Sequence, residues 1–113
     1  MLDRQQQLFM KCLGCEVICY DNHYPEFLNG VETIDLGQLL AESDIISLHV
    51  VLNPDTRHLI NNQSLGKMKD GIMLINTRSG ELITTTELLK ALKSGKIAYL
   101  GLDGYEFKKS LFF

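Results

Sequence analysis

Short apolar runs alternate along the chain with segments of helical character. The runs with the length and composition of buried strands cover residues 17–20, 45–49, 72–76 and 98–103. Helices are predicted between them, over residues 35–43, 62–68 and 85–94. A helix over 5–13 and a short edge strand over 31–34 complete the pattern. Strands that alternate with helices indicate an α/β fold with a parallel sheet and right-handed crossovers.

The ends of these helices carry their own signals. Asp35 has the residue type and the position of an N-cap. Asp70–Gly71 is expected to stop one helix, and Gly95 is expected to end the helix over 85–94. The inward faces of two helices are predicted to consist of leucines, namely Leu36, Leu39 and Leu40 in the first and Leu88, Leu89 and Leu92 in the second.

The composition is that of one ordinary globular domain, or of a piece of one, with 113 residues, 45% of them hydrophobic and 22% charged. A formal net charge of -3 argues against nucleic acid as the partner, because phosphate binding needs a clustered basic face. No apolar run approaches the roughly 18 residues of a membrane span. The first residues lack the apolar core of a signal peptide. We therefore expect a cytoplasmic protein without a membrane partner.

Three cysteines lie close together at Cys12, Cys15 and Cys19. The first two have the C-x-x-C spacing of some zinc and redox sites. A structural zinc site needs a second pair of ligands, and the histidines are scattered singly along the chain. We therefore predict no metal site and expect the cysteines to be buried, reduced thiols that pack as small hydrophobic side chains.

Polar residues follow the predicted strands, at the edge where open parallel sheets bind their ligands. Asn76-Thr77-Arg78-Ser79-Gly80 follows one strand, and Leu100-Gly101-Leu102-Asp103 ends the next. Asp21 comes directly after the first predicted strand. A carboxylate there suits the two hydroxyls of a ribose and repels the extra phosphate of NADP. The alternative is a loop aspartate chosen for its turn propensity.

Three stretches together resemble the NAD-dependent D-2-hydroxyacid dehydrogenases, and most closely the D-lactate dehydrogenases. Residues 47–61 are similar to the family's S-L-H-x-P-L-T-P-x-T-x-x-L-I-N, residues 76–80 to N-T-S-R-G, and residues 100–106 to G-L-D-V-Y-E. The resemblance implies a Rossmann-type doubly wound parallel sheet, NAD as cofactor, and hydride transfer between NADH and a 2-keto acid such as pyruvate. The residues that it places at the cofactor are Asp21, Val50, Val51, Thr56, Thr77, Arg78, Ser79 and Asp103.

The catalytic positions of the family are altered in this chain. The family's arginine, which binds the substrate carboxylate, falls on Ser79, and Arg78 lies one residue early. Arg78 is the remaining catalytic candidate, although a shift by one residue in extended backbone would turn it to the opposite face. The family's glutamate falls on Lys108, and the chain stops before any segment that would carry the catalytic histidine. His49 is expected to be structural.

The start of the domain departs from the family as strongly. The glycines of the family's G-x-G-x-x-G fall on Met1, Asp3 and Gln6, and the first strand is missing, so the fold is expected to be a partial one. In the strand order 3-2-1-4-5-6 the first strand lies mid-sheet, and its loss leaves two unpaired edges. We expect the chain to form a homodimer through this gap, to take a strand-completing partner, to change its strand order, or to be marginally stable.

Two functions follow as hypotheses. In the first, residues 1–113 are an incomplete NAD-binding domain without a substrate domain, a fragment of an oxidoreductase that is inactive alone. In the second, the chain is a non-catalytic α/β binding module for a protein partner, or for weak binding of an adenosine nucleotide through Asp21. A flavodoxin-like or receiver-like domain is disfavoured, because the chain has neither the phosphate loop nor the acidic cluster that such a domain needs.

Overall fold

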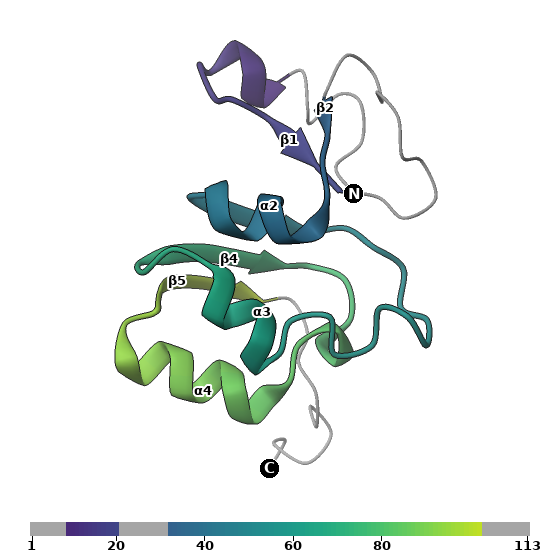
Figure 1. Ribbon diagram of the computed structural model, residues 1–113, viewed down its shortest axis with the longest axis vertical. Coiled ribbons are helices and arrows are strands. Elements are labelled where there is room, and N and C mark those ends of the chain that lie inside the picture. The colour runs from purple at the N-terminus through teal and green to yellow at the C-terminus, as the bar shows by residue number, and fades with distance from the viewer. Residues whose placement is uncertain (1–8, 21–31, 103–113) are drawn as a thin grey trace.

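The computed structural model describes residues 9–20 and 32–102 of the chain. Residues 9–12 are helical, and the elements that follow alternate between strand and helix as the apolar pattern predicts (Figure 1). Their bounds are β1 Ile18–Cys19, β2 Glu32–Thr33, α2 Leu36–Glu42, β3 Ile45–Leu48, α3 Asn62–Lys67, β4 Ile72–Asn76, the 3-10 turn η1 Gly80–Leu82, α4 Thr85–Ser94 and β5 Ile97–Leu102.

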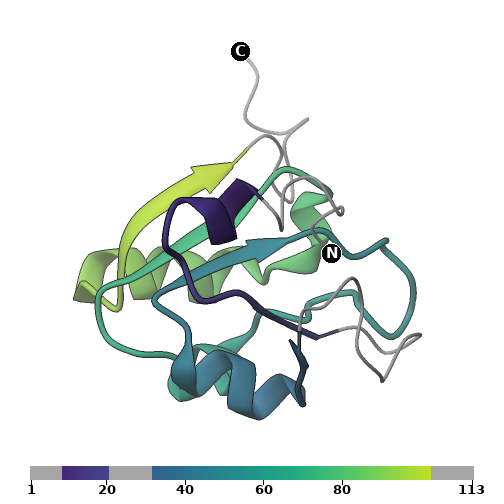
Figure 2. The ribbon, with the colours of Figure 1, turned by 90° about the horizontal axis from the view of Figure 1, so that it is seen from above.

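The strands of the described part form two separate parallel sheets. One has the order β1-β2 and the other the order β3-β4-β5. In the larger sheet Ile46 is paired with Leu74, and Leu74 with Leu100. The arrows of β3 and β5 point the same way in Figure 2. The expected α/β architecture is confirmed, and the strand order is not rearranged around the predicted gap, which lies between β1 and β3.

Helices α3 and α4 lie on the same side of β4 and β5, and the hydrophobic core lies beneath them (Figure 1). Alternate residues of β3 and β4 face this core, because successive side chains of a strand point to opposite faces. The strands contribute Ile46, Leu48, Ile72, Leu74 and Ile97. The helices and loops add Leu40, Ile60, Leu65, Met68, Leu82, Ile83, Leu88 and Ala91.

The buried stripe of α4 is narrower than the leucine pattern predicts. Leu88 and Ala91 are buried, whereas Leu89 is 53% exposed and Leu92 is 36% exposed. The prediction for Leu89 and Leu92 is therefore wrong. An ideal helix turns by about 100° per residue, so Leu89 lies about 100° around the helix from Leu88 and beyond the strip that the sheet covers. In α2 the prediction is better, because Leu40 is buried while Leu36 and Leu39 pack partly buried against the core.

Two of the three predicted helix ends are confirmed. The side chain of Asp35 accepts a hydrogen bond of 2.8 Å from the backbone N–H of Gln38 at the start of α2. Gly95 ends α4 with a φ of 81°, in the left-handed region that glycine adopts without strain. The helix α3 already ends at Lys67, so Asp70–Gly71 does not stop it. Gly71, with a φ of 79°, instead forms the turn into β4.

The prediction of buried cysteines holds for Cys19 and is wrong for Cys12 and Cys15, which are exposed. Cys12 lies in the helical turn over residues 9–12, and Cys15 lies in the segment that joins this turn to β1. Within residues 9–20 and 32–102 no group of three or more histidine, cysteine, aspartate or glutamate side chains could hold a metal ion. In the same part of the chain no helix is long and apolar enough to cross a membrane.

Replacing Leu74, whose exposed fraction is 0%, by alanine is expected to lower the free energy of unfolding by about 2–5 kcal/mol, because the change leaves a cavity at the centre of the core. The matched control is Leu89→Ala, at an exposed position, which should change that free energy by about 0.5 kcal/mol or less. Urea denaturation followed by circular dichroism measures both. Equal losses in the two variants would contradict this description of the core.

Candidate functional site

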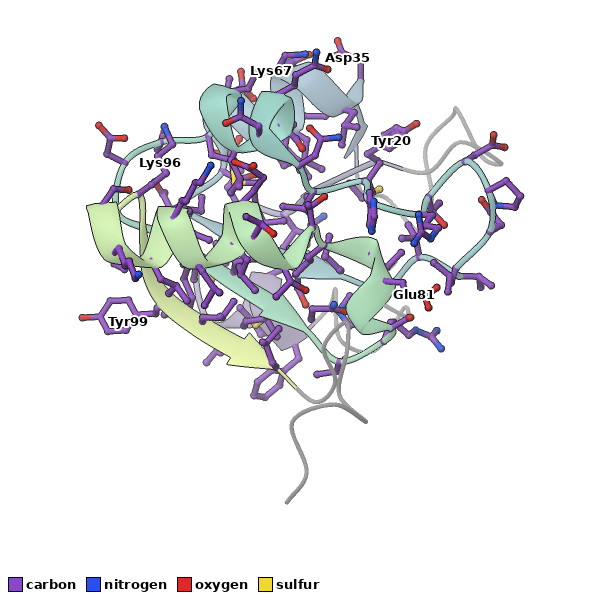
Figure 3. The ribbon with its side chains drawn as sticks, turned by 90° about the horizontal axis from the view of Figure 1, so that it is seen from below. Tyr20, Asp35, Lys67, Glu81, Lys96 and Tyr99 are labelled. Atoms are coloured by element: carbon purple, nitrogen blue, oxygen red, sulfur yellow. The ribbon has the colours of Figure 1, made fainter. Side chains whose placement is uncertain are left out.

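The loops after β3 and β4 lie side by side at the carboxyl edge of the three-stranded sheet. Three backbone hydrogen bonds join them: His58 N–H to Glu81 C=O at 2.8 Å, Ile60 N–H to Leu82 C=O at 2.9 Å, and Thr84 N–H to Ile60 C=O at 2.9 Å. Glu81 lies at the far end of the molecule from Lys96, which precedes β5 (Figure 3). The two loops, residues 49–61 and 77–84, therefore form one continuous ledge at the edge where such sheets bind ligands.

Thr56 shapes the first loop of the ledge. Its hydroxyl donates a hydrogen bond of 2.7 Å to the carbonyl of Val51 and accepts one of 2.8 Å from the N–H of Asn53. The Asn53 side chain in turn accepts hydrogen bonds from the N–H groups of Asp55 and Thr56. Thr56 is buried, and the loop that it holds presents Val51 with 70% of its surface exposed. An apolar side chain in that position can contact a ligand at the ledge.

Asn76, the last residue of β4, holds the second loop. Its side chain is completely buried. The Nδ2 group donates a hydrogen bond of 2.8 Å to the carbonyl of Ser79, and Oδ1 accepts one of 3.0 Å from the N–H of Arg78. One amide group thus satisfies two backbone groups of the turn that carries residues 77–79. The shape of that turn depends on Asn76.

Arg78 and Ser79 have different surroundings on this turn. Arg78 is exposed, while Ser79 is half-buried and caps η1 by accepting a hydrogen bond of 3.3 Å from the N–H of Glu81. In the described part of the chain no ion pair is formed by the Arg78 guanidinium, whereas Arg57 lies 4.0 Å from Glu81. Arg78 is thus exposed at the ledge, whereas the side chain of Ser79 stabilises the turn of the ledge by capping η1.

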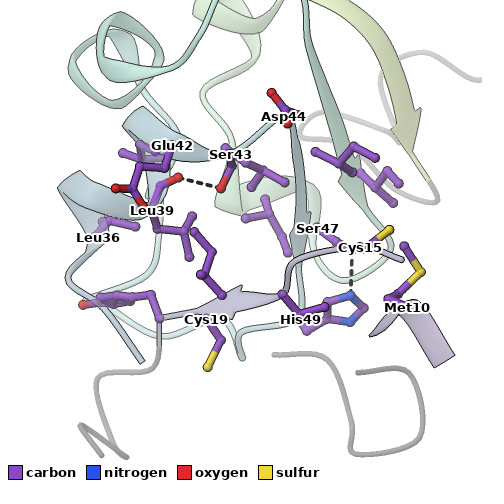
Figure 4. Close-up of a pocket in the computed structure, with 18 of the residues that line it drawn as sticks. Met10, Cys15, Cys19, Leu36, Leu39, Glu42, Ser43, Asp44, Ser47 and His49 are labelled. Atoms are coloured by element: carbon purple, nitrogen blue, oxygen red, sulfur yellow. Dashed lines mark hydrogen bonds between the residues drawn. The ribbon is translucent and has the colours of Figure 1, made fainter. Parts of the chain in front are cut away.

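His49 follows β3 directly, and its Nε2 atom lies 2.7 Å from the hydroxyl oxygen of Ser47 (Figure 4). The two residues are two positions apart in the chain, so both side chains stand on the same face of the strand. The pairing occupies one ring nitrogen of the half-buried imidazole. This arrangement agrees with the structural role expected for His49.

Several residues singled out from the sequence lie outside the described part of the chain. Two of them, Asp21 and Asp103, are predicted cofactor contacts. The others are the departures from the family pattern at Met1, Asp3, Gln6 and Lys108. Of the eight predicted cofactor residues, the ledge therefore brings together Val50, Val51, Thr56, Thr77, Arg78 and Ser79.

The sequence profile of the D-isomer specific 2-hydroxyacid dehydrogenases, NAD binding domain, matches residues 4–110. The chain belongs to this family. That domain binds NAD, and the ledge at the carboxyl ends of β3 and β4 lies where a doubly wound sheet holds a dinucleotide. The resemblance that the three sequence stretches indicate is thereby confirmed.

Relatives agree in both sequence and structure. The chain is 45% identical over 101 residues to 2-hydroxyacid dehydrogenase A of Aspergillus oryzae, covering 88% of this chain and 29% of that protein. It is 42% identical over 107 residues to D-lactate dehydrogenase of Escherichia coli K12, covering 92% of this chain and 32% of that protein. The Salmonella D-lactate dehydrogenase structure superposes with a TM-score of 0.86 at 42% identity, over 97% of this chain and 34% of that one. The chain thus spans about a third of the length of these relatives, and the Rossmann-type fold is confirmed.

Asn76 is the site residue that sequence reasoning misses. It stands at the end of an apolar run, where the sequence places it in the motif that follows the strand. A polar residue that continues the inward alternation of Ile72 and Leu74 is a usable signal, because a buried amide needs hydrogen-bond partners. The nearest backbone groups without strand partners are those of the following turn.

Asn76→Ala is expected to lower the free energy of unfolding by about 1–3 kcal/mol and to loosen the turn over 77–79, because two backbone groups of that turn lose their buried partner. Asn62→Ala, at an exposed position in the first turn of α3, is the matched control. Amide hydrogen exchange should show faster exchange at Arg78 in Asn76→Ala alone. Unchanged protection of the Arg78 amide in that variant would show that Asn76 does not hold the turn.

Proposed function

We propose that this chain is the cofactor-side part of a D-2-hydroxyacid dehydrogenase of the D-lactate dehydrogenase type, and that it does not catalyse hydride transfer alone. The observation that carries the proposal is the ledge, which joins the loops after β3 and β4 at the expected edge of the sheet. Its cofactor is NAD, which supplies the hydride when bound, and its substrate class is a 2-keto acid such as pyruvate. A cytoplasmic location stays a prediction.

The residues of the ledge fit a dinucleotide in part. Val51 and the half-buried Val50 offer apolar surface to the cofactor, and the hydroxyl of Thr56 keeps that surface in place through the Val51 carbonyl. Thr77 and Arg78 are exposed at the neighbouring turn. Arg78 can pair there with a negatively charged phosphate or carboxylate. The contacts proposed for Asp21 and Asp103 with the ribose and the nicotinamide amide complete the set.

The turn over residues 77–79 supports the inactivity of the chain. The position at which the family carries its substrate-binding arginine is occupied by Ser79, a short neutral side chain whose hydroxyl caps η1. A serine cannot supply the permanent charge and the paired donors with which an arginine binds a carboxylate. Arg78 sits one residue earlier and is exposed. Orientation and polarisation of a 2-keto acid would therefore be lost.

The second candidate function is a non-catalytic binding module. One observation favours it, namely the cavity between β1 and β3, because within the described part of the chain each of these strands is paired on one side only. In that case the ledge would bind an adenosine nucleotide weakly or be retained only as scaffold. A homodimer or a strand-completing partner would then close the sheet.

Titration of the 113-residue chain with NADH, followed by NMR, should shift the amide signals of residues 50–51 and 77–79. We expect weak binding, of about -4 to -6 kcal/mol, because the glycine loop that receives the pyrophosphate is not matched. Val51→Asp should weaken binding at least fivefold, since it replaces apolar surface by a charge that repels phosphate. Leu89→Asp, at another exposed apolar position, should leave binding unchanged.

The same samples with pyruvate added should show no oxidation of NADH. Turnover by the unmodified chain would overturn the proposed inactivity. Binding that is equally strong in Val51→Asp would overturn the placement of the cofactor at the ledge.

A further inference from the structure

His58, in the first loop of the ledge, has a backbone conformation that only glycine adopts freely. Its φ is 56°, and in the described part of the chain it is the one residue other than glycine with a positive φ. Residues with a Cβ atom disfavour this left-handed region, because the Cβ atom comes too close to the following carbonyl oxygen. Such a conformation persists only where the surrounding structure fixes it, and residues of this kind cluster at functional sites.

The left-handed residue changes the direction of the first loop. Before it, the N–H of Arg57 donates a hydrogen bond of 2.9 Å to the carbonyl of Asn53, which closes one helical turn. A left-handed residue commonly ends such a turn. After His58 the chain runs parallel to the second loop, where Ile60 is bridged to Ile83. The change of direction at His58 thus brings the first loop alongside the second.

The three backbone hydrogen bonds that join the loops of the ledge all involve His58 or Ile60. The N–H of His58 donates to the carbonyl of Glu81 at 2.8 Å, and the other two bonds are made by the N–H and the carbonyl of Ile60. The ion pair between Arg57 and Glu81 contributes little in comparison, because its atoms lie 4.0 Å apart and its side chains are 55% and 50% exposed. The placement of the two loops relative to each other therefore depends on the backbone path through His58.

The side chain of Asn61 holds His58 in this conformation. Its Nδ2 group donates a hydrogen bond of 3.0 Å to the carbonyl of His58. Its Oδ1 atom accepts hydrogen bonds of 2.9 Å and 3.1 Å from the N–H groups of Gln63 and Ser64, in the first turn of α3. Because these two bonds fix the amide group of Asn61, they also fix the direction of its Nδ2 donor. Helix α3 therefore supports the left-handed residue through Asn61.

Ser64 supports the next residue of the loop. Its hydroxyl donates a hydrogen bond of 2.8 Å to the carbonyl of Leu59 and accepts one of 2.8 Å from the N–H of Asn61. Ser64 itself is buried. Two successive carbonyl groups, those of His58 and Leu59, are thus bound by side chains at the start of α3. The first loop cannot slide along the second without losing both of these hydrogen bonds.

We propose that His58 and Asn61 are positioning residues of the ledge. The left-handed conformation of His58, held by Asn61, sets the placement of the two loops and thereby the affinity of the ledge for a dinucleotide. Val51 lies on the first loop and Arg78 on the second, so a ligand that contacts both is bound best when the loops keep this placement. Neither positioning residue needs to touch the ligand. The effect on affinity rests on the proposed function, whereas the effect on the loops does not.

Two pairs of variants of the 113-residue chain test this proposal. His58→Gly and His58→Val both remove the imidazole, but glycine adopts the left-handed conformation freely, whereas a β-branched residue strongly disfavours it. Asn61→Ser keeps an oxygen that can cap α3 and removes the Nδ2 donor. Its matched control is Asp35→Ser, the same kind of change at the N-cap of α2.

Two measurements are made on each variant. Amide hydrogen exchange at Ile60 and Thr84 reports on the hydrogen bonds between the two loops. Exchange at Ile46, in β3, shows whether the larger sheet stays folded. Titration with NADH, followed by NMR, reports on the affinity of the ledge.

His58→Gly should keep the protection of the Ile60 and Thr84 amides, and the affinity for NADH, within about twofold of the unmodified chain. His58→Val should lower that protection by about tenfold or more and the affinity by about fivefold, with Ile46 still protected. Asn61→Ser should lower both by about fivefold, because one hydrogen bond is lost. Adding His58→Gly to Asn61→Ser should recover most of the loss, since glycine needs no support. Asp35→Ser should change neither quantity.

Equal results for His58→Gly and His58→Val would overturn the proposal, because the left-handed conformation would then not matter. Unchanged protection of the Ile60 amide in Asn61→Ser would overturn it as well. If His58→Val also loses protection at Ile46, Asn61→Ser and its recovery by glycine decide the proposal. An unmodified chain without NADH shifts would overturn the proposed function instead, and the exchange data would still decide whether His58 and Asn61 position the loops.

Discussion

Backbone hydrogen bonding between neighbouring strands is the constraint on which this structure depends, and among residues 9–20 and 32–102 it is met on only one side of β1 and of β3. The three-stranded sheet has its own core beneath α3 and α4, with Leu74 fully buried at its centre. The smaller sheet has two residues in each of its strands and a single buried apolar residue, Cys19, in β1. Most of the apolar burial, and thus most of the stabilisation, therefore comes from residues 36–102.

The candidate site depends on the larger sheet alone. The ledge is made of the loops after β3 and β4, and its hydrogen bonds join those loops to each other. The buried side chains of Thr56 and Asn76 fix the two loops. Thr56 holds the backbone of the exposed Val51, and Asn76 holds the backbone of the exposed Arg78. The shape of the ledge therefore does not depend on how β1 and β3 are joined. The proposed loss of catalysis rests on Ser79, a serine that shapes the turn at the family's substrate-binding position.

Much of this fold can be predicted from the sequence, because each strand is a short apolar run and the helix signals are local. Asp35 and Gly95 act through their own residue type within one turn of a helix, so both could be assigned from the sequence. The exposure of Leu89 and Cys12 could not, since it depends on which neighbours cover a surface. A helical repeat of leucines indicates that one face of a helix is apolar. It does not indicate how wide a strip of that face the sheet covers.

The candidate site, like the fold, can be predicted from the sequence only in part. The transposition at Arg78 and Ser79 is visible in the sequence, because it is a departure at known positions of a motif. The role of Asn76 depends on a turn closing back on the strand that precedes it, which requires coordinates. The strand order predicts a gap between β1 and β3, and the residues that line the cavity there emerge only when the two strands are placed in space.

The most direct test of the central claim is amide hydrogen exchange of the chain in dilute solution, read at neighbouring residues of β3. Ile46 directs its N–H toward β4, and Ser47 directs its N–H into the cavity. Slow exchange at Ile46 together with exchange at least tenfold faster at Ser47 is the predicted result. Equal protection of the two amides would contradict the account, because it would mean that the edge of β3 is already paired.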